Sequence, residues 1–514
     1  MLKPPRQAAV AATILFAFLA GAFAAPALAA RPLGAFTTRG AWTFYSAPGL
    51  HPPQLSTTAH TIGAKLARGY LILSNFRDLG ASAPMVGQSG PMILDNRLRP
   101  VWFAPVPVSK LATNLQVQSY NGQPALSWWQ GVISKHGATV SGEDVVVGQD
   151  YRKIASLKGQ GGWVISPHEM VISGHNAWVT AYKPVSMSLT PQGGSANGTL
   201  LDCAVQEYDL QTGALLYTWD ALGHIPLAQA KISPGPANVP WDAYHVNSIQ
   251  LQPGSGTSGS FLVSMRNTWG VYLVDIATGK VTWTLGGSAS NFTFGQQANF
   301  SWQHDAQLSR GGLLTLFDDA CCGMKGTTFV PANGPARGLV LRLDTTAHTA
   351  TLVAQYERAK NFLVSFLGSM QLLPGGNALV GWGSRPYFTE FSAGGKVLLN
   401  AVLPAPDVSY RARLASWVGQ PAFPPAGAVR KVNGRVTVYA SWDGATLVAK
   451  WRVLAGTSGR HLAPAATARK NGFETSMTVS KSYKVYKVQA LDRKGRVLGS
   501  SALFPRKKVT IPFY

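Results

Sequence analysis

The sequence predicts an all-β protein in which a β-propeller is followed by a small β-sandwich. The chain of 514 residues contains 54 glycines and only 13% charged residues, a composition typical of strands joined by tight turns. Apolar and polar residues alternate through residues 248–252, 261–265 and 271–275, as expected of strands with one buried face. At this length we expect one large domain and one smaller domain.

A recurring turn motif predicts the propeller. Asp209 and Asp275 each begin a D-x-x-T-G motif followed by a tryptophan, and they are 66 residues apart. Weaker copies occur around Asp344 and in residues 388–402. An antiparallel unit repeated at such spacing is typical of a propeller, because each blade is a small sheet. Division of this region among six blades gives about 65 residues each, so we expect six blades with long loops.

The second domain is predicted beyond a linker, GQPAFPPAG at residues 419–427. The strand-like alternation that follows indicates a small sandwich of immunoglobulin or fibronectin type III character, with Trp442 and Trp451 as core anchors. The predicted organisation is a signal peptide at 1–30, a propeller at 31–420 and a basic sandwich at 428–514.

The first thirty residues have the features of an export signal. Lys3 and Arg6 precede an apolar run over residues 8–23, and small residues then allow cleavage near Ala29 or Ala30. No later segment has the apolar length needed to span a bilayer. We therefore expect a secreted or periplasmic protein.

Three cysteines leave the disulfide pattern open. Cys321 and Cys322 are adjacent, and a bond between neighbours strains disulfide geometry. A bridge from Cys203 to either of them would leave one free thiol, and burial of all three as small hydrophobic side chains is an equal alternative.

The positive charge is concentrated near the C-terminus. The whole chain has a net charge of +23, and the segment from Arg430 to Tyr514 holds 17 basic residues against three acids. This segment contains no nucleic-acid-binding motif, so we expect no nucleic-acid partner. A solvated basic face is the default interpretation, and contact with an anionic cell-envelope polymer is the alternative.

Polar residues at the ends of predicted strands indicate a site. His245, Asn247, Arg266, Asn267 and His304 lie in otherwise apolar and aromatic sequence. Their recurrence in successive strand units predicts one shared pocket.

A series of short motifs follows in order along the chain: GPMILDNRLRPVWFAP at Gly90, D-x-x-H-x-N-S at Asp242, S-x-R at Ser264, W-x-L-G-G at Trp283, QHDA at Gln303, LFDD at Leu316, GSMQLLPGGNALVGWG at Gly368 and SYRAR at Ser409. In their order and spacing these motifs resemble the bacterial arylsulfotransferase (ASST-type) family, in its secreted branch. The resemblance covers roughly residues 90–421.

This resemblance implies a six-bladed propeller with its active site at one end of the central channel. It also implies sulfuryl transfer from an aryl sulfate to a phenol, without a nucleotide sulfate donor or another cofactor. The implied nucleophile is His304, which would be transiently sulfated. His245 and Asn247 match a family H-x-N pair, Arg266 matches a sulfate-binding arginine, and His168 corresponds to a further histidine beside the sulfate.

The chemistry of these residue types fits that implication. A neutral imidazole is a good nucleophile near neutral pH, and a covalent intermediate divides one difficult transfer into two easier ones. A fixed arginine and amide donors such as Asn247 and Asn267 would stabilise the charge on the transferred group. A protonated His245 or His168 would donate to the departing phenolate. Trp269 and Trp302 would line an aromatic slot.

Other interpretations of the same residues are available. Arg266 could form a structural pair with Asp242 or Asp305, and Asp318-Asp319 is interpreted as a blade turn, because no calcium-loop pattern surrounds it. We expect no metal site. The main alternative function is a non-catalytic secreted propeller that binds an anionic glycan or envelope partner. A quinone-dependent dehydrogenase is disfavoured, since the sequence lacks a calcium loop and a tryptophan-rich repeat.

Overall fold

The computed structural model describes residues 36–60, 65–134, 139–252, 259–325, 328–330, 334–432 and 435–505, so the predicted signal peptide lies outside the described residues. The all-β prediction is confirmed, because the described chain is built of strands with three short 3-10 helices. No helix within these ranges is long and apolar enough to cross a membrane. The helices are η1 (Thr190–Gln192), η2 (Leu227–Gln229) and η3 (Arg266–Thr268).

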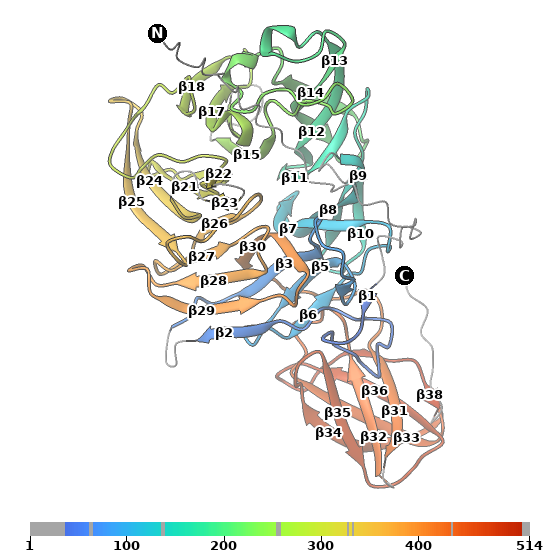
Figure 1. Cartoon of the computed structure of the whole chain (residues 1–514). Helices are drawn as coiled ribbons and strands as arrows, with labels where there is room; N and C mark the ends of the chain where they lie inside the picture. Colours follow the sequence, from blue (N-terminus) through green and yellow to red (C-terminus); the bar gives the residue numbers. More distant parts are fainter. Residues whose placement is uncertain are drawn as a thin grey trace, which may run out of the picture.

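Six sheets of four or five strands follow one another around a common centre in the described part of the chain (Figure 1). The first contains β7 (Leu111–Tyr120), β8 (Gln123–Ile133), β9 (Thr139–Gly148) and β10 (Lys153–Leu157). The second contains β11 (Val164–Ser173), β12 (Asn176–Met187), β13 (Gly198–Asp209) and β14 (Leu215–Asp220). The third contains β15 (Val246–Gln252), β16 (Ser260–Met265), β17 (Gly270–Asp275) and β18 (Val281–Gly286).

The remaining three sheets complete the ring. The fourth contains β20 (His304–Leu308), β21 (Leu313–Asp318), β24 (Arg337–Asp344), β25 (Thr349–Glu357) and β19 (Thr293–Phe294). The fifth contains β26 (Ser369–Leu372), β27 (Ala378–Gly381), β28 (Tyr387–Phe391), β29 (Val397–Val402) and β2 (Ser56–His60). The sixth contains β30 (Asp407–Ala415), β3 (Tyr70–Arg77), β5 (Gly90–Leu94) and β6 (Pro100–Phe103).

The inner strands form a closed circuit, since β7, β11, β15, β20, β26 and β30 each contact the next and β30 contacts β7. Both ends of this region close the ring. The early strand β2 pairs with β29 in the fifth sheet, and the late strand β30 pairs with β3 in the sixth. Two short pairs lie outside these sheets: β1 (Phe36–Thr37) with β4 (Met85–Val86), and β22 (Gly323–Lys325) with β23 (Thr328–Val330).

The recurring motif marks outer hairpins, as a propeller repeat should. Asp209 Oδ1 accepts hydrogen bonds from two backbone N–H groups in the β13–β14 turn, and Asp344 Oδ1 does so in the β24–β25 turn. In the β17–β18 turn, Asp275 Oδ1 accepts from the N–H of Thr278. Each carboxylate thereby stabilises a tight turn locally, which explains why short sequence patterns predict these hairpins.

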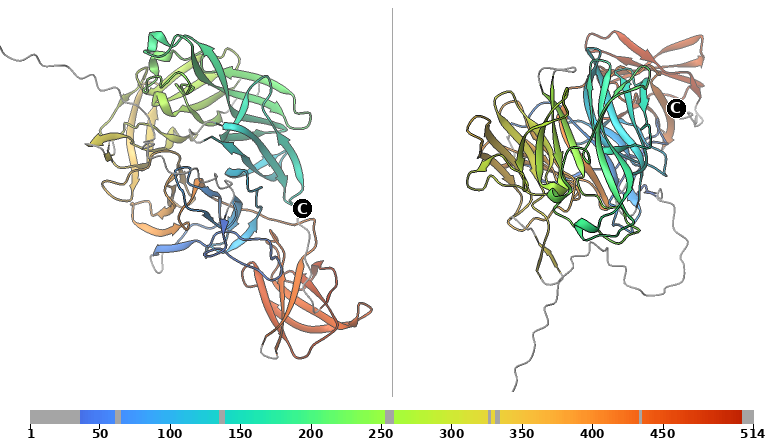
Figure 2. Two further views of the ribbon diagram at one scale, coloured as in Figure 1. Left: turned by 45° about the vertical axis from the view of Figure 1, so that its right-hand side comes forward. Right: turned by 90° about the horizontal axis from the view of Figure 1, so that it is seen from above.

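Two facing sheets form the C-terminal region. One contains β31 (Ala426–Val432), β32 (Arg435–Ser441) and β35 (Glu474–Val479), and the other contains β34 (His461–Arg469), β33 (Lys450–Ser458), β36 (Val485–Leu491) and β37 (Val497–Ser500), with β38 (Phe504–Pro505) paired to β36. Their core includes the fully buried Trp451, with Trp442 packed against it. The views in Figure 2 show this unit at one side of the ring.

Direct contacts join the C-terminal sheets to the ring. The N–H of Phe103 donates to Asp443, Tyr151 Oη donates to the carbonyl of Gly444, and the N–H of Ser46 donates to Glu474.

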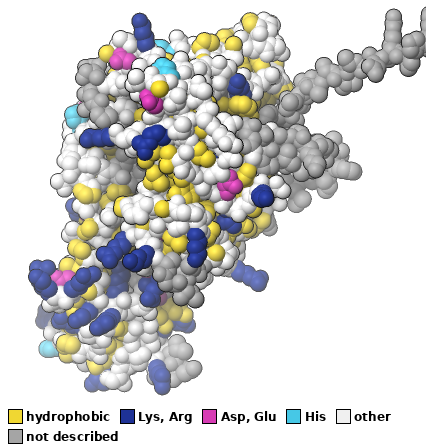
Figure 3. All heavy atoms as spheres, turned by 90° about the vertical axis from the view of Figure 1, so that its left-hand side faces the viewer, with side chains coloured by type: hydrophobic (Ala, Val, Ile, Leu, Met, Phe, Trp, Pro, Cys, Tyr) yellow, Lys and Arg dark blue, Asp and Glu magenta, His cyan; other side chains and the backbone are white. Residues whose placement is uncertain are grey.

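The Lys and Arg side chains gather in the lower part of Figure 3, over the C-terminal sheets, as the charge distribution along the sequence predicts.

Candidate active site

Three histidines from consecutive sheets lie side by side at the inner strands. His168 is in β11, His245 immediately precedes β15, and His304 begins β20. The ring centroids of His168 and His245 are 4.9 Å apart, and those of His245 and His304 are 6.4 Å apart. The sequence-predicted histidines are therefore brought into one cluster.

Irregular backbone aims these side chains toward one another. His245, Trp302 and Asp305 have positive φ angles of 57°, 58° and 58°, which are unusual for residues with side chains. The strand register shifts beside the same positions in β15 and β20, and also in β11 around His168. Bulges redirect side chains, and strained backbone of this kind concentrates at functional sites.

His304 is completely buried, and both of its ring nitrogens face other groups. Its Nδ1 lies 2.9 Å from Asp319 Oδ2, and its Nε2 accepts a hydrogen bond of 3.3 Å from the N–H of Leu367. The Nδ1 contact is close but is not aligned as a hydrogen bond, since neither atom has a hydrogen-bond partner. Burial, reinforced by the nearby Arg266, lowers the pKa of His304 well below its usual value. The imidazole is therefore neutral near pH 7.

The other two histidines differ in exposure. The side chain of His245 is 24% exposed, and its Nδ1 lies 2.5 Å from Asp242 Oδ2, to which it donates a hydrogen bond. His168 is buried and its Nδ1 forms a hydrogen bond of 3.1 Å with Ser166 Oγ. Burial, followed by the charge of the neighbouring His245, lowers the pKa of His168 well below its usual value. Of the two, His245 is the one whose side chain is in contact with solvent.

Arg266 lies beside His304 in helix η3, and several groups hold its guanidinium. It donates to Asn267 Oδ1 at 2.9 Å and to the carbonyl of Ser365 at 2.8 Å. Its Nε lies 3.9 Å from Asp319 Oδ2. Asn267 in turn donates to the carbonyl of Asp242 at 2.6 Å, so it connects the arginine to the segment that carries His245.

The two tryptophans pack against cations. The rings of Trp269 and Trp302 meet edge to face at 5.4 Å. The guanidinium of Arg266 lies 4.7 Å from the Trp302 ring, and Lys231 Nζ lies 5.4 Å from the Trp269 ring. Both indole N–H groups are buried without a hydrogen-bond partner among the described residues.

Asn247 lies among the site residues, but its amide N–H₂ donates to the carbonyl of Gln303 at 2.7 Å. Its own backbone carbonyl accepts from Tyr410 Oη at 3.0 Å and from Arg411 at 2.9 Å. Asn247 therefore holds strands β15, β20 and β30 together in this structure.

Sequence reasoning missed an important carboxylate. The interpretation of Asp318-Asp319 as a blade turn is wrong, because both residues are fully buried at the end of β21 and Asp319 contacts His304. An apolar strand that ends in two adjacent acids was the available signal, since carboxylates are rarely buried without a partner. The suggested pairings of Arg266 are also revised, since it approaches Asp319.

A second charged group adjoins the histidines and was also missed. Arg411 is almost fully buried and donates to Glu169 Oε2 at 2.7 Å, while Asp305 lies 3.8 Å from the same guanidinium. Arg413 pairs with Asp305 at 2.5 Å. The SYRAR segment that supplies both arginines contributed to the family resemblance, but sequence spacing does not reveal their partners.

The cysteines follow neither of the two alternatives left open by the sequence, a Cys203 bridge or three unpaired side chains. Cys321 and Cys322 are joined to each other, and Cys203 is buried and free. Within the described ranges, no group of three or more His, Cys, Asp or Glu side chains is arranged to hold a metal ion.

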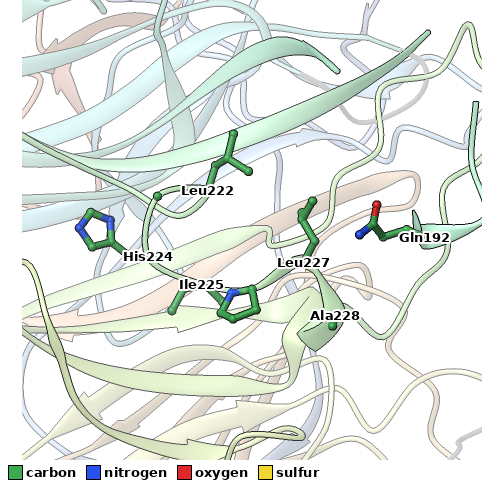
Figure 4. Close-up of a pocket in the computed structure, with 8 residues that line it drawn as sticks. Gln192, Leu222, His224, Ile225, Leu227 and Ala228 are labelled. Carbon is green, nitrogen blue, oxygen red and sulfur yellow. The ribbon is translucent and has the colours of Figure 1, made fainter. Parts of the chain in front are cut away.

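A surface hollow lies elsewhere, on the loop after β14. Figure 4 shows His224, Leu222 and Leu227 around it, with Gln192 at the opposite side. None of the three clustered histidines lines this hollow. The histidine cluster therefore places the candidate active site at the inner strands and not in this hollow.

These features define an all-β propeller-like protein with a histidine cluster, an arginine and buried carboxylates at its inner strands. The family model for arylsulfotransferase (ASST) matches residues 116–403, more than half of the chain, and the chain belongs to this family. Membership supports aryl sulfotransferase activity, with an aryl sulfate donor and a phenolic acceptor.

Other comparisons give distant similarities. No relative is found among curated proteins by sequence. The chain is similar to a solved protein of unknown function from Bacteroides caccae, with 11% identity, a TM-score of 0.39, and coverage of 67% of this chain and 99% of that one. It is also similar to the quinohemoprotein alcohol dehydrogenase from Comamonas testosteroni, with 13% identity, a TM-score of 0.28, and coverage of 82% and 66%. These scores are too low to transfer a function.

Proposed function

We propose that this protein transfers a sulfuryl group from an aryl sulfate to a phenol in two steps, through a sulfohistidine at His304. The observation that carries the proposal is a neutral, buried imidazole held beside a carboxylate and an arginine in a member of the arylsulfotransferase family. A neutral imidazole has the lone pair that nucleophilic catalysis requires.

In the first step, His304 Nε2 forms a bond to sulfur while the bond from sulfur to the aryl oxygen breaks. The departing phenolate takes that electron pair and receives a proton from His245, whose Nδ1 is fixed by Asp242. In the second step, His245 removes the proton of an incoming phenol, whose oxygen attacks the sulfur and releases His304. A phenolate leaves far more readily than an aliphatic alkoxide, which favours aryl substrates.

The surrounding residues have supporting roles in this proposal. Arg266 would balance the negative charge of the sulfuryl oxygens, while Asn247 and Asn267 fix the strands that carry the reacting groups. His168 is held neutral by burial, so it would act as a hydrogen-bond donor to the sulfate rather than as the acid. Trp269 and Trp302 would provide an aromatic surface for the phenol.

Substrate entry requires a local movement in this proposal. The N–H of Leu367 donates to the lone pair of His304 Nε2, and the guanidinium of Arg266 donates to the carbonyl of Ser365. A bound sulfate would take over both contacts, because its oxygens accept from the Leu367 N–H and from the guanidinium. Residues 365–367 would shift to admit it.

We also interpret the six sheets as six blades in a domain at 31–420, and residues 428–514 as an immunoglobulin- or fibronectin-like domain. Export through residues 1–30 and contact of the basic domain with an anionic envelope polymer belong to the same proposal. The three acids of that domain support the contact, since Asp443, Glu474 and Asp492 are each engaged within the protein. Most Lys and Arg residues within 428–432 and 435–505 are exposed, and of these only Arg496 forms an ion pair with one of the three acids.

The decisive experiment uses 4-nitrophenyl sulfate as donor and phenol as acceptor. We expect nitrophenolate release that depends on phenol, and an added sulfuryl mass on a peptide containing His304 after exposure to donor alone. In His304→Ala both signals should disappear, whereas the control His461→Ala, at an exposed position, should keep them. Full turnover in His304→Ala would refute the sulfohistidine.

A second candidate function is non-catalytic binding of an anionic glycan or envelope partner. The complete burial of His304 favours this alternative, because a reacting nitrogen must be reached by its substrate. Saturable binding of a sulfated glycan, with no turnover and no sulfuryl adduct on the wild-type protein, would support it.

A further inference from the structure

Two adjacent carboxylates at the end of β21, Asp318 and Asp319, are equally buried but differ in their hydrogen-bond partners. Asp318 accepts hydrogen bonds from the N–H groups of Ser301 and Ala320, and its other oxygen pairs with Arg337 at 3.0 Å. Asp318 therefore has the partners that a buried carboxylate needs for structural stability.

Asp319 has no such set of partners. Its side chain is fully buried, and neither oxygen has a hydrogen-bond partner among the described residues. Its Oδ2 faces two groups of the proposed site, His304 Nδ1 at 2.9 Å and Arg266 Nε at 3.9 Å. A buried carboxylate without hydrogen bonds is costly, so its retention at this position calls for a functional explanation.

The hydrogen bond from Leu367 indicates where the proton on His304 lies. A backbone N–H donates to Nε2, so that nitrogen carries the lone pair. A neutral imidazole has one ring proton, which must then be on Nδ1, the nitrogen that faces Asp319. Burial raises the pKa of Asp319 well above its usual value, with a smaller contribution from Asp318, while Arg266 favours the ionised form. A positive charge on the His304 ring, 2.9 Å away, would favour the ionised carboxylate further.

We propose that Asp319 is the positioning residue that keeps the His304 proton on Nδ1 and stabilises the positive charge of the ring while Nε2 is bonded to sulfur. This inference rests on the proposed function and deepens it. As the bond from Nε2 to sulfur forms, the phenolate takes the electron pair of the broken bond. The ring proton stays on Nδ1, and the carboxylate of Asp319 balances the charge that the ring acquires.

The adjacent acids provide a matched pair of variants. Asp319→Asn keeps the shape of the side chain and removes its charge, so kcat should fall by about 10³-fold or more, with a much smaller change in KM. Asp318→Asn should lower the unfolding temperature, because it breaks the pair with Arg337, yet retain kcat per folded molecule within a fewfold range. Wild-type kcat in Asp319→Asn would overturn the proposal.

A spectroscopic measurement separates this role from the proposed function. In donor-free protein labelled with ¹⁵N-histidine, wild-type His304 should show a protonated Nδ1 and an unprotonated Nε2. Asp319→Asn should shift these resonances toward a mixture of tautomers, while Asp318→Asn should leave them unchanged. Identical His304 resonances in wild type and Asp319→Asn would overturn the positioning role.

The two measurements together keep the two ideas distinct. A wild-type protein without turnover or adduct, but with the expected tautomer shift in Asp319→Asn, would refute the sulfotransferase proposal and retain Asp319 as the residue that fixes the His304 proton. An active wild type with unchanged resonances and unchanged kcat in Asp319→Asn would refute only the role of Asp319.

Discussion

His168, His245 and His304 lie in one cluster, and they differ in how deeply they are buried. His168 and His304 are buried and their pKa values are lowered, while His245 keeps partial contact with solvent. Desolvation acts on each ring separately, so neighbouring imidazoles in one cluster can differ in their pKa values. The residue types predicted a site, but only the structure shows which rings are buried.

We predict that breaking the buried ion pair between Glu169 and Arg411 strongly destabilises the fold. Glu169→Gln leaves a buried guanidinium with weaker compensation, so we expect a loss of roughly 3 kcal/mol or more in the free energy of unfolding. The control Asp150→Asn affects an exposed pair with Arg152 at 3.8 Å, and should change stability by less than about 1 kcal/mol. Denaturant titration of both variants measures the difference, and equal midpoints would contradict it.

At the scale of elements, the site depends on where regular strands become irregular. The starts of β15 and β20 carry bulges and positive φ angles, and the segment before β26 continues this pattern at Leu367 and Gly368. Regular pleating sends successive side chains of a strand to opposite faces, and a bulge changes the direction of the side chains beside it, so the irregular starts of β15 and β20 affect where His245 and His304 point.

Gly368 is predicted to be essential for the segment that covers His304. It has a φ of 127°, and a Cβ there would lie 2.3 Å from Phe317, which is opposite His304 in the β20–β21 pair. Gly368→Ala should cost roughly 1–2 kcal/mol from the backbone and a further ~1–3 kcal/mol from overpacking.

Gly375 is the matched control, because its φ is 94° but a Cβ would meet nothing within 4 Å. Gly375→Ala should carry only the backbone cost. Thermal unfolding of the two variants tests the distinction, and a Gly368→Ala protein as stable as Gly375→Ala would show that the segment adapts freely.

For the whole molecule, strands from both ends of the propeller region complete the ring. The C-terminal sheets contact β6 of the last sheet, the β9–β10 turn of the first sheet and the segment before β2 through polar contacts. Phe44 and Phe473 also meet across this boundary, with ring centroids 4.3 Å apart. Asp443 accepts a hydrogen bond from the Phe103 N–H at this boundary, and burial raises its pKa to about 8. The docked state therefore favours the protonated acid.

This boundary is predicted to weaken as pH rises. The folded pKa of Asp443 exceeds the unfolded value of 3.8, so its contribution is present at low pH and is lost between about 4 and about 8. Asp443→Asn keeps an acceptor for the Phe103 N–H and cannot ionise. The unfolding temperature of wild type relative to Asp443→Asn should fall between pH 5 and pH 8, and calorimetry at both values measures it. A constant difference would contradict the prediction.

The sequence by itself determined the strands and turns of this protein, because those depend on neighbours along the chain. Alternation at 248–252 and 271–275 became β15 and β17, and the carboxylate of Asp275 stabilises the predicted turn. The three histidines and Arg266 were also found, since polar residues at strand ends in apolar sequence are conspicuous.

Only the tertiary structure decided which strand ends meet and which groups become buried together. It placed Asp319 against His304, paired Arg411 with Glu169 and turned the amide of Asn247 toward Gln303. The physical reason is that ring closure joins residues distant in sequence, and that protonation depends on a burial and a set of neighbouring charges which no local pattern records.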